Sequence, residues 1–272
     1  LSSKFQMSKI KKKILITGGA GLIGSILIKG LDHKYDFSSL DLNPVENINS
    51  HIANLSNLEK IQPAFENIDT VIHLAADRSS DAPWESVLTN NLIGTYNVFE
   101  AAKRSNCQRV IFASSNHATG GFYTSPPWKF IAEGNYYKLK ENQYDLIDEN
   151  YRIRPDGYYG VAKAYGESIG SYYSDYYQLS CLNLRIGWVI SNDDPTFSPF
   201  ALSLWLSHSD TVQIFDLCIK ASNNIKYDTF YATSDNTWKI FNIEKAKQKL
   251  GYKPSNGAGS SFKLSNPPLR DQ

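Results

Sequence analysis

The sequence has few sulfur-containing residues, with three cysteines and one methionine among its 272 residues. Cys107, Cys181 and Cys218 are far apart and odd in number, and their spacing is not that of a metal site. This pattern argues against a disulfide-stabilised secreted domain and against a zinc module. We therefore expect three reduced, buried thiols and no bound metal.

Charge of one sign and long apolar runs are also scarce. The 28 Lys and Arg residues are balanced by 27 Asp and Glu, for a net charge of +1, so nothing indicates nucleic-acid or membrane-surface binding. No apolar run approaches the roughly 20 residues of a membrane helix, and no secretory signal is visible. We expect a cytoplasmic, globular protein whose partner is a small molecule.

Strand-like and helix-like segments alternate through the first two thirds of the chain. Short apolar runs predict strands at 14–16, 37–42, 70–75, 110–114 and 182–190. Apolar residues at helical spacing predict helices between them, the two longest at 87–104 and 157–177. The alternation predicts an α/β fold, with helices on both faces of a doubly wound parallel sheet.

The pattern is less regular after residue 190. Short helices are expected at 201–206, at 212–221 with Asp210 as its N-cap, and at 244–250, where Gly251 ends the helix. Residues 257–272 are rich in Gly, Ser and Pro, which predicts a flexible tail.

The segment 126–154 is unusual because it holds six aromatic residues among many charges, between a strand and the longest helix. Loops of this length in a compact domain are commonly functional or disordered. Two interpretations stay open. The segment is a surface insertion with one short helix, or it is a lid over a substrate.

A glycine-rich turn follows the first strand. Residues 17–24 read T-G-G-A-G-L-I-G, and Gly18, Gly21 and Gly24 have the spacing of a dinucleotide-binding loop. The first glycine allows a tight turn, the second admits the pyrophosphate to the backbone, and the third lets helix pack on strand. Because an apolar helix follows directly, its N-terminal amides would face the phosphates. The motif predicts a Rossmann-type fold that binds NAD.

Asp41 ends the second predicted strand, about 20 residues beyond the glycine loop, where a carboxylate can bind the adenosine ribose hydroxyls. No arginine or lysine follows it directly. A 2′-phosphate beside Asp41 would meet repulsion without compensation, so NAD is favoured over NADP.

Tyr159 and Lys163 are four residues apart and share a helix face. An ammonium beside a phenol stabilises the phenolate and lowers its pKa, which suits a general base for an alcohol. Ser114 and Ser115 end a strand beside the cofactor, where a hydroxyl can bind the reacting oxygen.

These elements, in this order, resemble the short-chain dehydrogenase/reductase superfamily. The glycine spacing and the H-L-A-A stretch at 73–76 resemble its extended branch, the epimerase/dehydratase family. The resemblance implies Ser115, Tyr159 and Lys163 as the catalytic set, with Asn54 where the family usually has an aspartate near the adenine. The cofactor-binding residues implied are Gly18, Gly21, Leu22, Ile23, Gly24, Asp41, Leu42, Asn54, Leu55, Leu74, Ala75, Ala76, Asn91, Tyr159 and Lys163.

Four stretches are similar to bacterial uronate dehydrogenases: F-A-S-S-N-H (112–117), R-P-D-G-Y-Y-G-V-A-K (154–163), R-I-G (185–187) and W-L-S-H-S-D (205–210). Those enzymes oxidise a free hexuronic acid at C1 to a lactone. The resemblance implies sugar contacts from Ser115, Asn116, His117 and Tyr159. Arg185 would hold the carboxylate, or alternatively form a structural ion pair. Two departures are the long segment 126–154 and Trp188, where a small residue is expected.

Two other functions compete with a sugar dehydrogenase. An epimerase or dehydratase would act on a nucleotide-linked sugar, but dehydratases of this branch carry an acidic pair where Asn116 and His117 stand. A non-catalytic NAD sensor would not need a complete catalytic set. We expect an NAD-binding catalytic domain at 7–190, a small substrate-binding part at 191–256, and a homodimer formed through helices 87–104 and 157–177.

Overall fold

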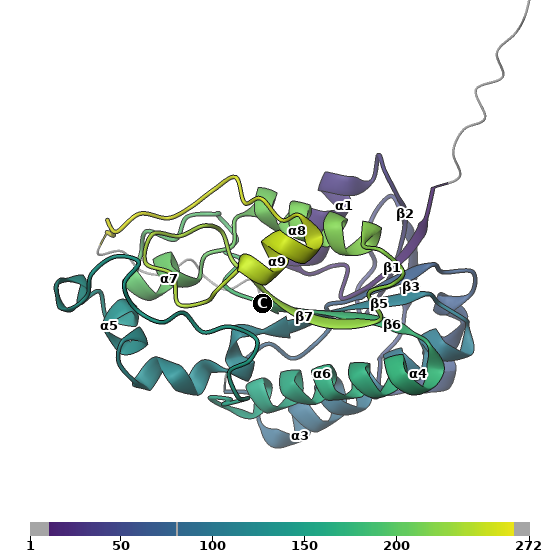
Figure 1. Cartoon of the computed structure of the whole chain (residues 1–272). Coiled ribbons are helices and arrows are strands. Elements are labelled where there is room, and N and C mark those ends of the chain that lie inside the picture. Colours follow the sequence, from purple (N-terminus) through teal and green to yellow (C-terminus); the bar gives the residue numbers. More distant parts are fainter. Residues whose placement is uncertain (1–10, 80, 264–272) are drawn as a thin grey trace, which may run out of the picture.

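The computed structural model describes residues 11–79 and 81–263. Its centre is a seven-stranded sheet in the order β3-β2-β1-β4-β5-β6-β7, in which every neighbouring pair is parallel (Figure 1). The chain reverses its direction of winding between β1 and β4, and ligands of such sheets bind beyond the carboxyl ends of the strands at this point. The predicted α/β fold with a doubly wound parallel sheet is confirmed.

The strands are β1 (Lys13–Thr17), β2 (Asp36–Asp41), β3 (Asn49–Ile52), β4 (Thr70–His73), β5 (Arg109–Ser115), β6 (Ser180–Ile186) and β7 (Tyr227–Ala232). The α-helices are α1 (Leu22–Leu31), α2 (Leu58–Ile61), α3 (Trp84–Ser86), α4 (Gly94–Arg104), α5 (Trp128–Ala132), α6 (Tyr158–Tyr177), α7 (Pro199–Leu204), α8 (His208–Lys220) and α9 (Glu244–Leu250). Short 3-10 helices are η1 (Gln62–Phe65), η3 (Asn116–Ala118), η4 (Gly120–Thr124) and η5 (Tyr136–Lys138), and η2 (Val87–Ile93) is π-helical.

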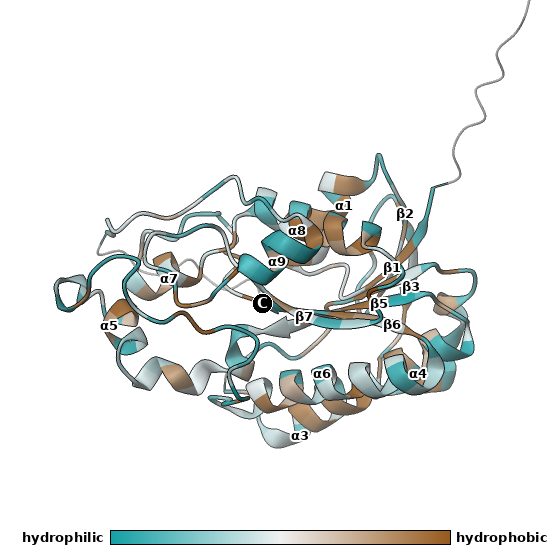
Figure 2. Cartoon of the chain, viewed as in Figure 1, coloured by the Kyte–Doolittle hydropathy of each residue, from teal (hydrophilic) through white to brown (hydrophobic). Residues whose placement is uncertain are grey.

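Two apolar cores lie on opposite faces of the sheet because strand side chains alternate between faces. Ile14 and Ile16 of β1 pack into one core with Leu27 of α1, whereas Leu15 packs into the other with Phe99 of α4. Helices α1, α8 and α9 cover the first face, and α4 and α6 cover the second (Figure 1). Figure 2 shows hydrophobic residues concentrated on the central strands between these two layers.

The strand expected at 182–190 is shorter in the structure, since β6 ends at Ile186. The backbone amide of Trp188 instead donates to the carbonyl of Leu204 at 2.7 Å, and Leu206 donates to the carbonyl of Trp188 at 3.0 Å. These bonds tie the chain after β6 to the end of α7.

The N-cap prediction for α8 is wrong, because Ser207, not Asp210, caps the helix. The Ser207 hydroxyl accepts the backbone amide of Asp210 at 3.1 Å. The buried Asp210 carboxylate accepts the amides of Ser255 (2.7 Å) and Asn256 (3.2 Å), which fixes the C-terminal segment to α8. At α9 the prediction is confirmed, since Gly251 ends the helix with φ +74°.

Residues 257–263 do not extend away from the fold, although the sequence predicted a tail from residue 257. Ala258 is buried, its amide donates to the Asn236 side chain at 3.0 Å, and its carbonyl accepts the amide of Thr237 at 2.8 Å. Residues 264–272, the rest of the predicted tail, lie outside the described part of the chain.

The segment 126–154 contains α5 and η5 and packs against the loop that precedes α9. Tyr136 stacks on Trp238 with ring centroids 4.8 Å apart, and the Tyr144 hydroxyl donates to the carbonyl of Lys239 at 2.9 Å. The Glu149 carboxylate accepts the amide of Tyr231 at 3.0 Å, at the open edge of β7. These contacts favour the interpretation as an anchored insertion.

All three cysteines are buried with free thiols, as the sequence predicted. Burial raises the thiol pKa of Cys107 and of Cys218 to about 12, and that of Cys181 further still. Within residues 11–79 and 81–263, no helix combines the length and the apolar character that crossing a membrane requires.

Candidate active site

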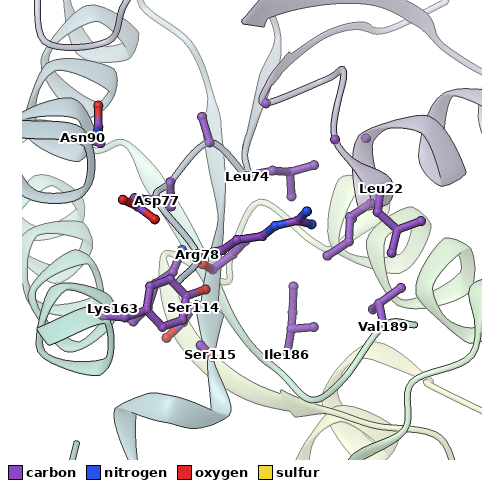
Figure 3. Close-up of a pocket in the computed structure, with 18 of the residues that line it drawn as sticks. Leu22, Leu74, Asp77, Arg78, Asn90, Ser114, Ser115, Lys163, Ile186 and Val189 are labelled. Carbon is purple, nitrogen blue, oxygen red and sulfur yellow. Dashed lines mark hydrogen bonds between the residues drawn. The ribbon is translucent and has the colours of Figure 1, made fainter. Parts of the chain in front are cut away.

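A cavity of about 800 Å³ lies beyond the carboxyl ends of β1, β2, β4, β5 and β6 (Figure 3). This volume is within the range of natural ligand sites. The cavity brings together these predicted residues: Gly18, Gly21, Leu22, Ile23, Gly24, Asp41, Leu42, Asn54, Leu55, Leu74, Ala75, Ala76, Ser115, Asn116, His117, Tyr159 and Lys163. No residue of 126–154 lines it.

The glycine-rich loop joins β1 to α1 with no space for side chains. Gly18 has φ +76°, and a Cβ there would lie 2.7 Å from the amide nitrogen of Ala75. A Cβ at Gly24 would lie 2.5 Å from the carbonyl oxygen of Gly19, and Gly21 caps α1. The bare backbone at the start of a helix fits the pyrophosphate of a dinucleotide.

Asp41 lies at the end of β2 with its carboxylate held by two backbone amides. Ala20 donates to Oδ2 at 3.0 Å and Asn43 donates to Oδ1 at 3.1 Å. These bonds hold the negatively charged Asp41 carboxylate beside the glycine loop. The next two residues, Leu42 and Asn43, also line the cavity. The Lys and Arg residues among the described residues that line the cavity are Arg78, in the loop after β4, and Lys163, on α6.

Tyr159 and Lys163 both face the cavity from α6, and Nζ of Lys163 lies 5.3 Å from the centroid of the phenol ring. Nζ donates to the carbonyl of Ala113 at 2.6 Å, and burial lowers the Lys163 pKa to about 7. Burial raises the Tyr159 pKa to about 12, against the opposing effects of the Ser115 hydroxyl and the Arg78 charge. Lys163 is therefore not among the groups that lower this pKa, contrary to the expectation from the sequence.

The two adjacent serines at the end of β5 point to opposite faces, as strand geometry requires. The Ser114 hydroxyl donates to Oε1 of Glu167 at 2.6 Å. The Ser115 hydroxyl accepts the amide of His117 at 3.2 Å and lies close enough to Tyr159 to lower the phenol pKa. This placement favours Ser115 over Ser114 as the residue that meets a reacting oxygen.

His117 is held beside Tyr159 by an ionic partner that the sequence analysis did not include. Its Nδ1 lies 2.9 Å from both carboxylate oxygens of Asp156, and its ring meets that of Tyr159 edge-on at 5.5 Å. Two glycines make space for this pair. A Cβ at Gly120 would lie 2.0 Å from Asp156 Oδ2, and one at Gly160 would lie 2.2 Å from the His117 carbonyl oxygen.

Arg185 does not line the cavity, although the resemblance implied that it holds a substrate carboxylate. Its Nε and Nη2 donate to the two carboxylate oxygens of Glu167 at 2.9 and 2.8 Å, and Nη1 donates to the Tyr231 hydroxyl at 3.1 Å. Strand register explains the difference. Arg185 is paired with Ser114, facing α6, whereas the next residue, Ile186, is paired with Ser115 and faces the cavity. Arg185 therefore forms a buried ion pair with Glu167, which was the alternative interpretation of this residue.

Comparison with known proteins agrees with this geometry. Residues 14–209 match the NAD dependent epimerase/dehydratase family. The chain belongs to this family. One relative, the NAD-dependent glucose-6-phosphate dehydrogenase of Haloferax volcanii, is 32% identical over 94% of this chain and 97% of its own length.

Two other similar proteins are named as uronate dehydrogenases. The uronate dehydrogenase of Pseudomonas syringae pv. tomato is 28% identical over 90% of this chain and 82% of its own length. The structure of uronate dehydrogenase from Agrobacterium tumefaciens, Y136A mutant complexed with NAD, superposes with a TM-score of 0.77 at 26% identity. That match covers 91% of this chain and 86% of the other.

Asn91, for which the epimerase/dehydratase family resemblance implied a cofactor contact, does not line the cavity. It is buried in η2, and its side-chain amide forms two hydrogen bonds with the backbone of Asp77. Oδ1 accepts the Asp77 amide at 2.7 Å, and Nδ2 donates to the Asp77 carbonyl at 2.8 Å. The neighbouring Asn90 lines the cavity instead.

Arg78 and Phe200 line the cavity and were not predicted from the sequence. Arg78 follows β4 by five positions, and a basic residue just beyond the carboxyl end of a central strand was the available signal. Phe200 is on α7 and had no comparable signal. Trp188, noted as a departure from the uronate dehydrogenases, also lines the cavity, with its ring centroid 6.2 Å from that of Phe200.

Proposed function

We propose that this chain is an NAD-dependent dehydrogenase that oxidises C1 of a free sugar to a lactone. The observation that carries this proposal is the cluster of Ser115, His117 and Tyr159 in the cavity lining, where the first two each lie beside the phenol of Tyr159. A hydroxyl bound there meets one acid/base group and two groups that can fix its orientation. When bound, NAD⁺ supplies the acceptor for the hydride from C1.

Each residue has a separate task. Tyr159 acts as the base only in its phenolate form, in which it takes the proton of the C1 hydroxyl, and Ser115 donates a hydrogen bond to the same oxygen. Lys163 fixes the α6 side of the site through its bond to Ala113, and it would hold the ribose of a bound cofactor. Because a carboxylate can only accept hydrogen bonds, Asp156 places the proton of His117 on Nδ1 and leaves Nε2 for a sugar hydroxyl.

The cofactor proposal is NAD rather than NADP. Asp41 is fixed where the adenosine ribose would bind, and its carboxylate has lone pairs left for ribose hydroxyls. A 2′-phosphate would stand next to this carboxylate, and the lining residues that directly follow Asp41 are the uncharged Leu42 and Asn43, which would not offset the repulsion.

The sugar itself is not identified by the names of the relatives. One is named for glucose 6-phosphate, one for L-arabinose and others for uronates. The ion pair of Arg185 with Glu167 removes the reason to single out a uronate on that residue. Trp188 and Phe200 instead give the sugar-binding end an aromatic wall.

The alternative is an epimerase or dehydratase that acts on a nucleotide-linked sugar. Asn116 and His117 follow Ser115, so the acidic pair expected of a dehydratase is absent from these positions.

One experiment distinguishes a sugar dehydrogenase from an epimerase or dehydratase. Purified protein with NAD⁺ is mixed with free aldoses, uronates, sugar phosphates and UDP-sugars, and NADH formation is followed by absorbance. Net NADH with a free sugar supports the proposal, whereas isomerised UDP-sugar without net NADH would overturn it.

We also propose a homodimer. Large apolar side chains are exposed on the outer faces of η2, α4 and α6, including Leu88, Ile93, Tyr96, Val161 and Tyr172. Pairing these helices with those of a second copy would cover them, and tyrosines are common at such interfaces. A monomeric mass in light scattering at micromolar concentration would contradict this proposal.

A further inference from the structure

We propose that Tyr123 is a positioning residue that directs the proton of the Ser115 hydroxyl toward the reacting oxygen, through the side-chain amide of Asn116. This inference rests on the proposed function, in which the Ser115 hydroxyl donates a hydrogen bond to that oxygen. Ser115 ends β5 in the cavity lining (Figure 3), and Asn116 follows it there. Tyr123 lies in η4, outside the cavity lining.

The Asn116 side chain connects the two hydroxyl groups. Its Nδ2 lies 2.7 Å from the Tyr123 hydroxyl oxygen, and its Oδ1 lies 3.3 Å from the Ser115 hydroxyl oxygen. A carboxamide has donors at one end and an acceptor at the other. Rotation of the amide by 180° therefore exchanges the two ends and reverses the direction of both hydrogen bonds.

The two distances favour the reversed amide, in which Oδ1 faces Tyr123 and Nδ2 faces Ser115. Hydrogen bonds between two oxygens are commonly about 2.7–2.8 Å long and extend to about 3.0 Å, whereas those from N–H donors are commonly about 2.9–3.0 Å and extend to about 3.2 Å. The 2.7 Å contact thus has the length of a bond from the Tyr123 hydroxyl to an oxygen. The 3.3 Å contact at Ser115 is too long for two oxygens and is closer to the range of an N–H donor.

The phenol of Tyr123 also requires an acceptor for its proton. Burial raises the pKa of this phenol well above its usual value, so the group stays protonated at neutral pH. Its ring is fixed edge-on against Phe200 and Phe241, with centroids 5.1 and 6.1 Å away. Among the described residues, the polar group within hydrogen-bond distance of this fixed hydroxyl is the Asn116 amide, whose oxygen would accept the proton.

The reversed amide leaves one direction for the Ser115 proton. A serine hydroxyl has two lone pairs and one proton. The backbone amide of His117 donates to one lone pair at 3.2 Å, and Nδ2 of Asn116 would donate to the other. The proton then points to the phenol oxygen of Tyr159 or to a sugar oxygen bound beside it. Burial raises the Tyr159 pKa and the Ser115 hydroxyl opposes this effect, as a donor to the phenol oxygen does.

The first test measures kcat for the sugar that gives the fastest NADH formation. Tyr123→Phe keeps the ring and removes the hydroxyl, so the Asn116 oxygen becomes free to bind the Ser115 proton. We expect kcat to fall roughly 3- to 30-fold, as for the loss of one oriented hydrogen bond. KM should change less than about threefold, because the cavity lining is unaltered. Tyr144→Phe, which loses a phenol hydrogen bond outside the cavity, is the matched control and should keep kcat within about twofold.

A double-mutant cycle separates this role from packing. Ser115→Ala lowers kcat by itself, and Tyr123→Phe added to it should change kcat less than about twofold, because no Ser115 proton is left to direct. If Tyr123 acts through packing, the two losses will multiply. Multiplied losses would overturn the proposal, as would a Tyr123→Phe variant with the kcat of Tyr144→Phe.

The amide orientation is measured without turnover by NMR of the wild-type NADH complex. We expect strong nuclear Overhauser contacts from the Nδ2 protons of Asn116 to the β protons of Ser115. Strong contacts to the ring protons of Tyr123 would instead overturn the proposal. If neither free sugars nor UDP-sugars react, the proposed function fails, and the NMR contacts decide the orientation separately.

Discussion

Both carboxylate oxygens of Asp156 lie 2.9 Å from Nδ1 of His117, directly beside the phenol of Tyr159. Gly120 and Gly160 have no space for a Cβ at this pair, so the backbone is shaped around it. Asp156 therefore orients the imidazole of His117 through Nδ1 and leaves Nε2 for a ligand.

Asp156→Asn should raise KM for the sugar about tenfold, because His117 loses a charge-assisted partner that fixes its orientation. kcat should fall less, and the NADH dissociation constant should be unchanged, since no contact of Asp156 reaches the glycine loop. Steady-state kinetics with fluorescence titration of NADH measures all three. Asp32→Asn, on the exposed surface, serves as the matched control. A purely structural role would instead lower kcat and cofactor affinity together.

Tyr159→Phe should reduce kcat by at least about 100-fold, because only the proton-transfer group is removed. The phenyl ring preserves the packing against His117, so NADH should bind with nearly wild-type affinity. Stopped-flow or steady-state NADH formation gives the rate, and fluorescence titration gives the affinity. Activity above a few per cent of wild type would assign the base to another residue.

Lys163→Met should change how stability depends on pH in the cofactor-free protein. Burial lowers the Lys163 pKa from 10.5 to about 7, so between these values the unfolded chain binds a proton that the folded chain does not. The stability of wild type therefore rises with pH across this interval and carries the full penalty below it. Relative to Lys163→Met, the melting temperature of wild type should be lower at about pH 6 than at about pH 9. Lys60→Met, at an exposed position, should show no such change.

Arg185→Ala should lower the free energy of unfolding by about 3–5 kcal/mol, because Glu167 would be left as an uncompensated buried charge. Any loss in kcat/KM should be the same for neutral and anionic sugars. Replacing both partners, as in Arg185→Met with Glu167→Met, should restore much of the stability. Urea denaturation measures these differences. A loss confined to uronates would return Arg185 to the substrate site.

Asp41→Ala should weaken NAD⁺ binding roughly 10- to 100-fold, because the ribose hydroxyls lose a charged hydrogen-bond acceptor. Binding of NADP⁺ should weaken less or improve, since the same change removes the repulsion of its 2′-phosphate. Titration of both cofactors against wild type and variant tests this prediction. Equal affinities of wild type for NAD⁺ and NADP⁺ would show that Asp41 does not discriminate.

The features predicted correctly from the sequence are those set by local geometry. The glycine spacing at 18, 21 and 24 dictates a turn into a helix, and an (i, i+4) pair such as Tyr159 and Lys163 must share a helix face. The continuous burial of β1 from Ile14 to Thr17 likewise follows from its apolar run. None of these features depends on which distant segment packs nearby.

The differences between the sequence-based expectations and the structure involve tertiary partners. Arg185 follows the same strand pattern as its neighbours, but only the register with β5 shows that it faces Glu167 rather than the cavity. Asn91 was assigned to the cofactor, yet it binds a loop whose position depends on β4 and η2 together. Arg78 lies in that loop, where no periodicity indicates direction, so the sequence pattern did not identify it.

The burial of all three cysteines has a practical consequence for labelling. Their raised pKa values leave negligible thiolate at neutral pH, so the folded chain should be almost inert to maleimides. A Tyr137→Cys substitution, at a side chain that is 82% exposed in the segment 126–154, would introduce one fast-reacting thiol. A fluorophore attached there would report whether this segment moves when a sugar and NADH bind, without first removing any native cysteine.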